Sequence, residues 1–267
     1  MTKPLITITS DFGVQSHGVG VMEAVALEIN PDANVVHLAH GLPDFDLAYG
    51  ARTLESVFCT QIGYHVCVVD PGVGTSRKPI IIETKRGDFL IGPDNGVLIP
   101  ATRFLNGIKK AVEIRSPKYM KNPVSPIFHG RDIFTPAAAY LSTGIMIEEF
   151  GPELKTNELA KAPYEEAEIL KGAIKAKVIA VNKFGSLHLN IMHKEWDKFV
   201  QDVNKPLKIQ GKKMKINLPV GSTFGEVKKW QDLIMKDDFG RVEIATNQGS
   251  FVKKHKLKIG DEIKISK

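Results

Sequence analysis

The first 151 residues alternate short apolar runs with segments of helical spacing. The apolar runs predict strands at 5–9, 34–38 and 64–70, and the helical spacing predicts helices at 18–29, 45–58 and 131–144. The third run, YHVCVVD, is apolar almost throughout, which indicates burial on both faces of a sheet. PIIIET and DFLIG, separated by KRG, predict a hairpin. This alternation predicts an α/β fold with a mostly parallel sheet flanked by helices.

Local signals mark the ends of these helices. Asn30 and Pro31 end the first helix, because proline cannot continue a helix. Asp44 is the predicted N-cap of the second helix, and Gly144 closes the third.

The pattern changes after residue 151. Residues 152–170 are polar and helix-like, contain two prolines and predict a linker. The later segments are short and strand-like, namely AIKAKVIAV, SLHLNI, PLKIQ, KKMKINL, RVEIAT and DEIKI. Such strands, separated by turn residues, predict a small β-barrel or sandwich. We therefore expect an α/β domain over 1–151, a linker over 152–170 and a smaller β-barrel-like domain over 171–267.

Composition narrows the class of protein. The 267 residues are 43% hydrophobic and 25% charged, which suits one large or two ordinary globular domains. No apolar run reaches the roughly 18 residues of a membrane span, and MTKPLITITSDFG does not resemble a signal peptide. The only cysteines, Cys59 and Cys67, are expected to be reduced. We expect a cytoplasmic protein without a membrane partner.

The net charge of +6 comes mostly from lysines in the second half of the chain. These lysines alternate with apolar residues, as in KIQGKKMKIN, which is typical of the solvated faces of strands. We therefore expect no nucleic-acid partner.

Two predicted strands end in an acid that could reach a ligand. Asp11 follows LITITS and Asp70 ends HVCVVD, and glycine comes soon after each. In open α/β sheets ligands bind beyond the carboxyl ends of the strands. The two acids therefore predict a shared site.

Two further segments are candidates for the same site. In SPIFHGRDIF, His129 and Gly130 stand where an apolar run meets a helix, and Asp132 fits an ordinary first-turn acid. IGPDNGVL (91–98) predicts a turn from which Asn95 could face the site.

These residue types suit more than one reaction. Asp70 with His129 could polarise a water, and Arg77 could hold an anion such as hydroxide. Ligand type alone would also allow a metal site of Asp11, Asp70, Asp94 and His129, although no spacing favours it. The chain lacks a Gly-x-Ser-x-Gly elbow, a P-loop and a Gly-x-Gly-x-x-Gly motif, which disfavours serine hydrolases and the usual nucleotide folds.

Together, TSDFG, VVDPGVGTSR, GPDNG and FHGRDIF resemble the S-adenosyl-L-methionine (SAM) hydrolases, also called SAM hydroxide adenosyltransferases, which are related to fluorinating and chlorinating enzymes. The resemblance covers essentially the whole chain. It implies that water or hydroxide attacks ribose C5′ of SAM in line, which yields adenosine and L-methionine. It implies SAM as substrate, no cofactor and no metal. It also implies a homotrimer in which each site lies between the first domain of one subunit and the second domain of its neighbour.

The resemblance implies a catalytic triad of Asp70, Arg77 and His129. His129 and Asp70 would orient and deprotonate the water, and Arg77 would stabilise hydroxide. The segment 71–74 then predicts a turn that folds Arg77 back toward Asp70. An aspartate at the nucleophile site would repel a halide, so hydrolysis is favoured over halogenation.

The resemblance also implies the substrate contacts. Asp11 would accept hydrogen bonds from both ribose hydroxyls. Ser16 and His17 would close over the ribose. The other expected contacts are Asn95, Asn182, Phe184, Ser186, Asp238, Phe239 and Asn247, and Phe184 or Phe239 would stack on the adenine.

The second domain departs from the family pattern. Asn182 and Ser186 stand where the family has an aspartate and an asparagine, and Asp237-Asp238 stands where it has Asn-Ser. An acid would then have moved to the end that holds the amino group of SAM. Two alternatives follow: a protein that binds adenosine or SAM with little turnover, and a relative that uses another nucleophile such as halide.

Overall fold

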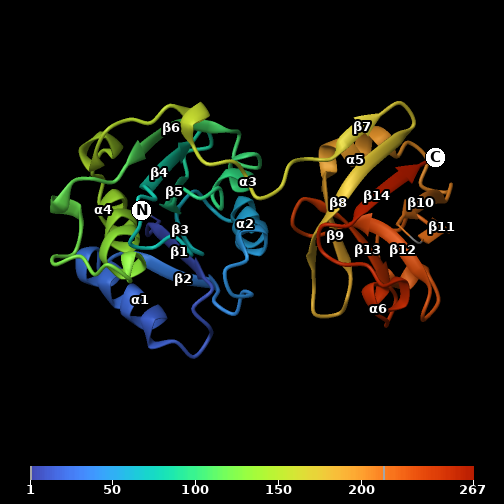
Figure 1. The fold of residues 1–267 in the computed structure, drawn as a ribbon, viewed down its shortest axis with the longest axis horizontal. Helices are drawn as coiled ribbons and strands as arrows, with labels where there is room; N and C mark the ends of the chain where they lie inside the picture. The colour runs from blue at the N-terminus through green and yellow to red at the C-terminus, as the bar shows by residue number, and fades with distance from the viewer. Residues whose placement is uncertain (1, 213) are drawn as a thin grey trace. The chain divides into compact units, whose positions relative to one another are not determined.

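The computed structural model describes residues 2–212 and 214–267, and the chain divides into two compact units after Pro163 (Figure 1). None of the helices in these residues is both long and apolar enough to cross a membrane.

A six-stranded sheet forms the centre of the first unit. Its strands are β1 (Leu5–Ser10), β2 (Asn34–Ala39), β3 (Tyr64–Val68), β4 (Pro79–Thr84), β5 (Phe89–Pro93) and β6 (Ile108–Glu113). Their order is β2-β1-β3-β5-β4-β6, and the first four strands in this order, β2, β1, β3 and β5, are parallel. β4 runs antiparallel to β5 and to β6. The mostly parallel sheet and the hairpin predicted from the sequence are thus confirmed.

Helices pack against both faces of this sheet. They are α1 (His17–Ile29), α2 (Leu47–Glu55), α3 (Ile99–Thr102) and α4 (Thr135–Ser142). α1 packs with α4 and α2 packs with α3, and the two pairs lie on opposite sides of the sheet (Figure 1). Four of the five residues of β3 are buried, as expected for a central parallel strand.

The predicted start of α2 was wrong. The helix begins at Leu47, and the side chain of Asp46, not of Asp44, accepts the backbone N–H of Tyr49 at 2.9 Å. The helix cannot extend back through Phe45, because that residue has a positive φ of 61°.

The Ala-rich helix predicted at 131–144 is divided. A π-helical segment, Gly130–Phe134, precedes α4. Such segments are rare and often occur at functional sites. Short 3₁₀ turns complete the helical structure: Ser56–Cys59, Pro117–Tyr119, Ile147–Phe150, Thr156–Glu158 and Phe224–Glu226.

The second unit is an antiparallel, nearly closed barrel. Its strands are β7 (Glu168–Leu170), β8 (Ala173–Val181), β9 (Leu187–Met192), β10 (Leu207–Gly211), β11 (Met214–Leu218), β12 (Asp232–Lys236), β13 (Arg241–Thr246) and β14 (Glu262–Ser266), with α5 (His193–Phe199) and α6 (Phe251–His255). The order is β11-β10-β14-β8-β9-β13-β12. Val220, just after β11, bridges to Ile234 of β12 and so links the two ends of the sheet. The predicted barrel-like fold is confirmed.

The helix-like character expected for 152–170 was wrong. This segment contains only the 3₁₀ turn Thr156–Glu158, and its last residues form β7, which pairs with β8 of the barrel. Pro152 and Pro163 explain why its polar residues do not continue into a helix.

Candidate active site

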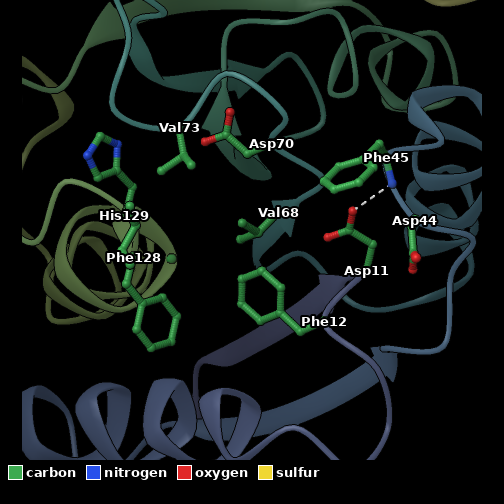
Figure 2. Close-up of a pocket in the computed structure, with 11 residues that line it drawn as sticks. Asp11, Phe12, Asp44, Phe45, Val68, Asp70, Val73, Phe128 and His129 are labelled. Atoms are coloured by element: carbon green, nitrogen blue, oxygen red, sulfur yellow. Dashed lines mark hydrogen bonds between the residues drawn. The ribbon is translucent and has the colours of Figure 1, made fainter.

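Asp11 and Asp70 lie at the same edge of the first sheet. Because β1 and β3 are parallel neighbours, their carboxyl ends meet, and the N–H of Asp11 donates to the carbonyl of Val68 at 3.4 Å. A pocket of about 240 Å³ opens at this edge and both acids line it. Figure 2 shows His129 on one side of the pocket, Asp11 with Phe45 on the other, and Asp70 between them.

Arg77 joins Asp70 to His129. Its Nε donates to Asp70 Oδ1 at 3.1 Å and its Nη2 to Asp70 Oδ2. The same Nη2 donates to Nδ1 of His129 at 3.0 Å. The Arg77 and Asp70 side chains are only 7% and 5% exposed. The prediction that the turn after Asp70 returns Arg77 to it is confirmed.

Thr75 and Gly74 shape this turn. The hydroxyl of Thr75 donates to the carbonyl of Gly72 at 2.7 Å and accepts the N–H of Arg77 at 3.3 Å. Gly74 has a φ of 76°, and a Cβ there would lie 2.5 Å from the carbonyl oxygen of Pro126. Only glycine fits this backbone conformation and this close approach.

The burial of the cluster sets its protonation states. Burial raises the pKa of Asp70 above its ordinary value, although the Arg77 guanidinium opposes the change. Burial, and next the positive charge of Arg77, lower the pKa of His129. Arginine can only donate, so Nδ1 of His129 is the acceptor and its proton resides on Nε2. Its lowered pKa and its accepting Nδ1 both favour a neutral His129, whereas the two N–H donors of Arg77 favour the carboxylate form of Asp70.

One donor of this cluster has no partner. Within the part of the chain that the structure describes, Nη1 of Arg77 is buried and makes no hydrogen bond. An unsatisfied buried guanidinium N–H is costly, and such a group in a native protein calls for an explanation. Arg77 is not among the residues that line the pocket, so the cluster presents Asp70 and His129, and not this donor, to the pocket.

Asp11 is oriented by a strained backbone. Its Oδ2 accepts the N–H of Phe45 at 2.9 Å, and Phe45 has the positive φ already noted. Phe45 is also 68% exposed at the pocket. Strain of this kind collects at functional sites, and the sequence signals neither this conformation nor this contact.

Aromatic rings next to the polar residues form much of the pocket wall. Phe12 and Phe128 meet edge to face with ring centroids 5.8 Å apart, and both line the pocket (Figure 2). The sequence analysis missed them, although each adjoins a candidate, Asp11 or His129. An aromatic residue beside each candidate is a signal that could have identified them.

Asp132 is more than a first-turn acid. It is fully buried, and its carboxylate accepts the N–H of Ser125 at 2.8 Å and pairs with Arg131. Its carbonyl accepts the N–H of Lys121. Asp132 thus stabilises the loop that leads to Phe128 and His129.

Other candidates of the first unit have structural partners instead. Ser16 caps α1 by accepting the N–H of Gly18, and His17 is exposed; neither lines the pocket. The amide of Asn95 donates to the carbonyl of Val69 at 2.8 Å and so supports the end of the strand that carries Asp70.

The ligand set considered for a metal is not assembled. Asp94 accepts the N–H of Ala160 at 2.9 Å. Among residues 2–212 and 214–267, no group of three or more His, Cys, Asp or Glu side chains is arranged to hold a metal ion.

The amides proposed for the second unit hold loops. Asn182 Oδ1 accepts the N–H groups of Phe184 and Ser186 at 3.0 and 3.1 Å. The amide of Asn247 donates to the carbonyl of Val227 at 2.8 Å. These contacts occupy the polar groups that the sequence analysis assigned to substrate.

Of the remaining candidates of the second unit, Ser186 is buried, whereas Phe184, Phe239 and Asp238 are exposed. Phe184 and Phe239 are 67% and 46% exposed, so neither is a core residue. Asp238 is exposed, whereas Asp237 is buried and accepts from the N–H groups of Phe239 and Arg241.

Comparison with known proteins places these features in context. Residues 6–151 match the SAM hydroxide adenosyltransferase N-terminal domain, and residues 176–264 match the C-terminal domain of the same name. An (R)-S-adenosyl-L-methionine hydrolase of Salinispora tropica is 30% identical and aligns over 98% of each chain. A fluorinase of Nocardia brasiliensis is 21% identical over 98% of this chain and 97% of its own. The crystal structure of an uncharacterized conserved protein from Thermotoga maritima superposes with a TM-score of 0.90 at 30% identity, over 98% of this chain and 100% of the other.

Proposed function

Because the chain belongs to the SAM hydroxide adenosyltransferase family, we propose that it hydrolyses SAM to adenosine and L-methionine. Its full-length relative from Salinispora tropica carries the name of that hydrolase. The observation that carries the proposal is the buried cluster of Asp70, Arg77 and His129, of which Asp70 and His129 line the pocket.

In the proposed step, a water in the pocket beside Asp70 and His129 attacks ribose C5′. The C5′–O bond forms as the C5′–S bond breaks, and the electron pair of that bond neutralises the sulfonium of SAM to the thioether of methionine. The water proton passes to Asp70, whose raised pKa makes it a better base, and then to solvent. Arg77 stabilises the developing hydroxide, and Nε2–H of His129 orients it. Asp70 thus takes the proton-accepting role alone.

Asp11 is the proposed ribose ligand. Its Oδ2 is held by Phe45, and its carboxylate retains lone pairs that can accept ribose hydroxyls. This would place C5′ in the same pocket as Asp70. Ser16, His17 and Asn95 are proposed to act only on the shape of this region.

Water is favoured over halide as the nucleophile. A halide in the pocket would face the carboxylate of Asp70, which repels it. The sulfonium is already a good leaving group, so we propose that the reaction uses neither a metal nor a cofactor.

We further propose that the protein is a cytoplasmic homotrimer whose sites are completed by the second domain of a neighbouring subunit. Exposed apolar residues at the pocket, Ile127 at 79% and Phe45 at 68%, support a covered site. Phe184, Phe239 and Asp238 are the proposed adenine and amino-group contacts from that neighbour.

Incubation of the purified protein with SAM, followed by chromatography of adenosine, tests the function. We expect adenosine and methionine in equal amounts, with no 5′-chloro product in excess chloride. Activity should persist in a chelator. If adenosine never exceeds the spontaneous background, the proposed hydrolysis is wrong, and the alternative of a protein that binds adenosine or SAM with little turnover remains.

A further inference from the structure

Four side chains form a continuous hydrogen-bonded chain beside the turn that carries Asp11. Ser10 Oγ lies 2.7 Å from Nδ1 of His40, whose Nε2 lies 2.8 Å from Nδ1 of His37. Nε2 of His37 lies 3.0 Å from Oε2 of Glu23. Ser10 and His40 are buried, whereas the Glu23 side chain is 41% exposed. The Ser10–Glu23 chain thus links β1, β2 and α1.

His40 holds this turn at two points. Ser10, bonded to its ring, accepts the N–H of Phe12 at 3.4 Å. The carbonyl of His40 accepts the N–H of Gly13 at 2.7 Å. Asp11 lies between these two attachments and lines the pocket. A change in the Ser10–Glu23 chain would therefore act on the backbone on both sides of Asp11.

When both histidines are neutral, the donors and acceptors allow only one direction of donation along the Ser10–Glu23 chain, which we call its polarity. The carboxylate of Glu23 can only accept, so the proton of His37 is on Nε2 and its Nδ1 accepts from His40. Nδ1 of His40 is then an acceptor and receives the hydroxyl proton of Ser10. Ser10 in turn accepts the N–H of Phe12, so every group in the chain is satisfied.

Protonation of His37 reverses this polarity. Its Nδ1 becomes a donor, so His40 must accept at Nε2 and donate from Nδ1 to Ser10. The hydroxyl of Ser10 then receives two N–H groups, and its own proton loses its acceptor. Among the described residues, the titratable groups in contact with His37 are Glu23 from α1 and His40, which follows β2. Burial, and next the charge on His37, lower the pKa of His40 to about 4.

We propose that the Ser10–Glu23 chain positions Asp11 for the ribose in the polarity that neutral His37 imposes, so that protonation of His37 weakens binding of the nucleoside. His40 is accordingly a positioning residue for binding. This inference rests on the proposed function, because it assigns the ribose to Asp11.

Two substitutions of His40 separate the two contacts of its ring. His40→Asn places an acceptor near the Nδ1 position and retains the bond from Ser10, whereas His40→Gln reaches the Nε2 position and loses it. We expect His40→Gln to raise the Kd for adenosine, measured by calorimetry, and the KM for SAM about fivefold. His40→Asn should change both by less than about twofold, and kcat should stay within about twofold in each. Equal values of Kd for the two variants would overturn the proposal.

His37→Asn tests the role of the proton. Its Oδ1 can accept from His40 in place of Nδ1, and it cannot be protonated. We expect the wild-type Kd for adenosine to rise as pH falls from 8 toward 5. This rise should be about five times as large as the rise in His37→Asn. At pH 8 the two proteins should have similar Kd values. Identical pH profiles would contradict the proposal, even if the His40 variants fail to fold.

Failure of the inference can be told apart from failure of the function. If the wild-type protein binds adenosine but produces none from SAM, the proposed hydrolase activity is wrong. The Kd values of the variants still test the role of the Ser10–Glu23 chain in that case. A protein that hydrolyses SAM, with Kd values that do not differ among the variants, contradicts only the role of the chain. Melting temperatures of all variants show whether a change in Kd merely follows lost stability.

Discussion

At the scale of single residues, the site depends on which donors and acceptors already form hydrogen bonds within the protein. Arg77 uses Nε and Nη2 on Asp70 and His129 and retains Nη1. The sequence predicted that Arg77 and Asp70 would meet, because a Pro-Gly turn separates them by only seven positions. It could not show that the side-chain amides of Asn95 and Asn182 form hydrogen bonds with backbone groups, because loop geometry determines those partners. Their assignment to substrate stays a prediction.

Substitution of Arg77 should affect rate more than binding. Arg77→Ala removes the positive charge proposed to stabilise hydroxide and the donors that hold Asp70 and His129, and we expect kcat to fall by at least about 100-fold. Steady-state kinetics with SAM measure this. A kcat within tenfold of wild type would contradict the role of Arg77.

The dependence on pH follows from Asp70. Its pKa is raised, and the proposed base is its ionised form, so kcat/KM should fall as pH falls through that raised pKa. Arg77→Lys keeps the charge but loses the paired donation that favours the carboxylate, so the pKa of Asp70 should rise further. We expect the acid limb of the kcat/KM profile to move to higher pH in Arg77→Lys. An unmoved limb would show that another group controls it.

At the scale of elements, the strand ends and the turn after β3 place the cluster. Parallel β1 and β3 bring Asp11 and Asp70 to one edge, which the alternating pattern predicted correctly. The starts of helices were less predictable: Asp44 and Asp46 are equally good caps by residue type, and only the backbone of Phe45 excludes the former. Similarly, a helical pattern does not distinguish the π-helical segment Gly130–Phe134 from α4.

Gly74 and Gly72 form a matched pair for testing the turn. A Cβ at Gly74 would collide with the carbonyl of Pro126 at a positive φ, whereas at Gly72 the nearest atoms lie at an ordinary 3.5 Å. We expect Gly74→Ala to lower the free energy of unfolding by about 1–3 kcal/mol and to lower kcat/KM. Gly72→Ala should leave both near wild type. Chemical denaturation and the adenosine assay check this, and equal stability of the two variants would contradict the argument.

At the scale of the whole molecule, the chain consists of an α/β unit and a β-barrel-like unit. The α/β unit contains the pocket and the complete Asp70, Arg77 and His129 cluster. The barrel unit presents the exposed rings of Phe184 and Phe239. The proposed homotrimer would combine these two surfaces from different subunits.

Mixing two inactive variants tests this combination. Asp70→Ala disables the first domain, and a double Phe184→Ala, Phe239→Ala variant disables the proposed adenine contact of the second. If sites form between subunits, dissociated and reassembled mixtures should regain up to about a quarter of wild-type activity. Sedimentation should report a trimer. Absence of recovery in mixed trimers would contradict shared sites.

The sequence by itself determined the order of elements, the acids at the strand ends and the turn beneath Arg77, because periodicity and turn chemistry act over a few residues. Only the tertiary structure decided the contacts across long separations. Arg77 meets His129 over 52 positions, and Asp11 meets the N–H of Phe45 over 34. The Ser10–Glu23 chain belongs to this second kind, since it joins two strands and a helix. Such contacts depend on how strands and helices pack, and packing is a property of the whole unit rather than of any segment.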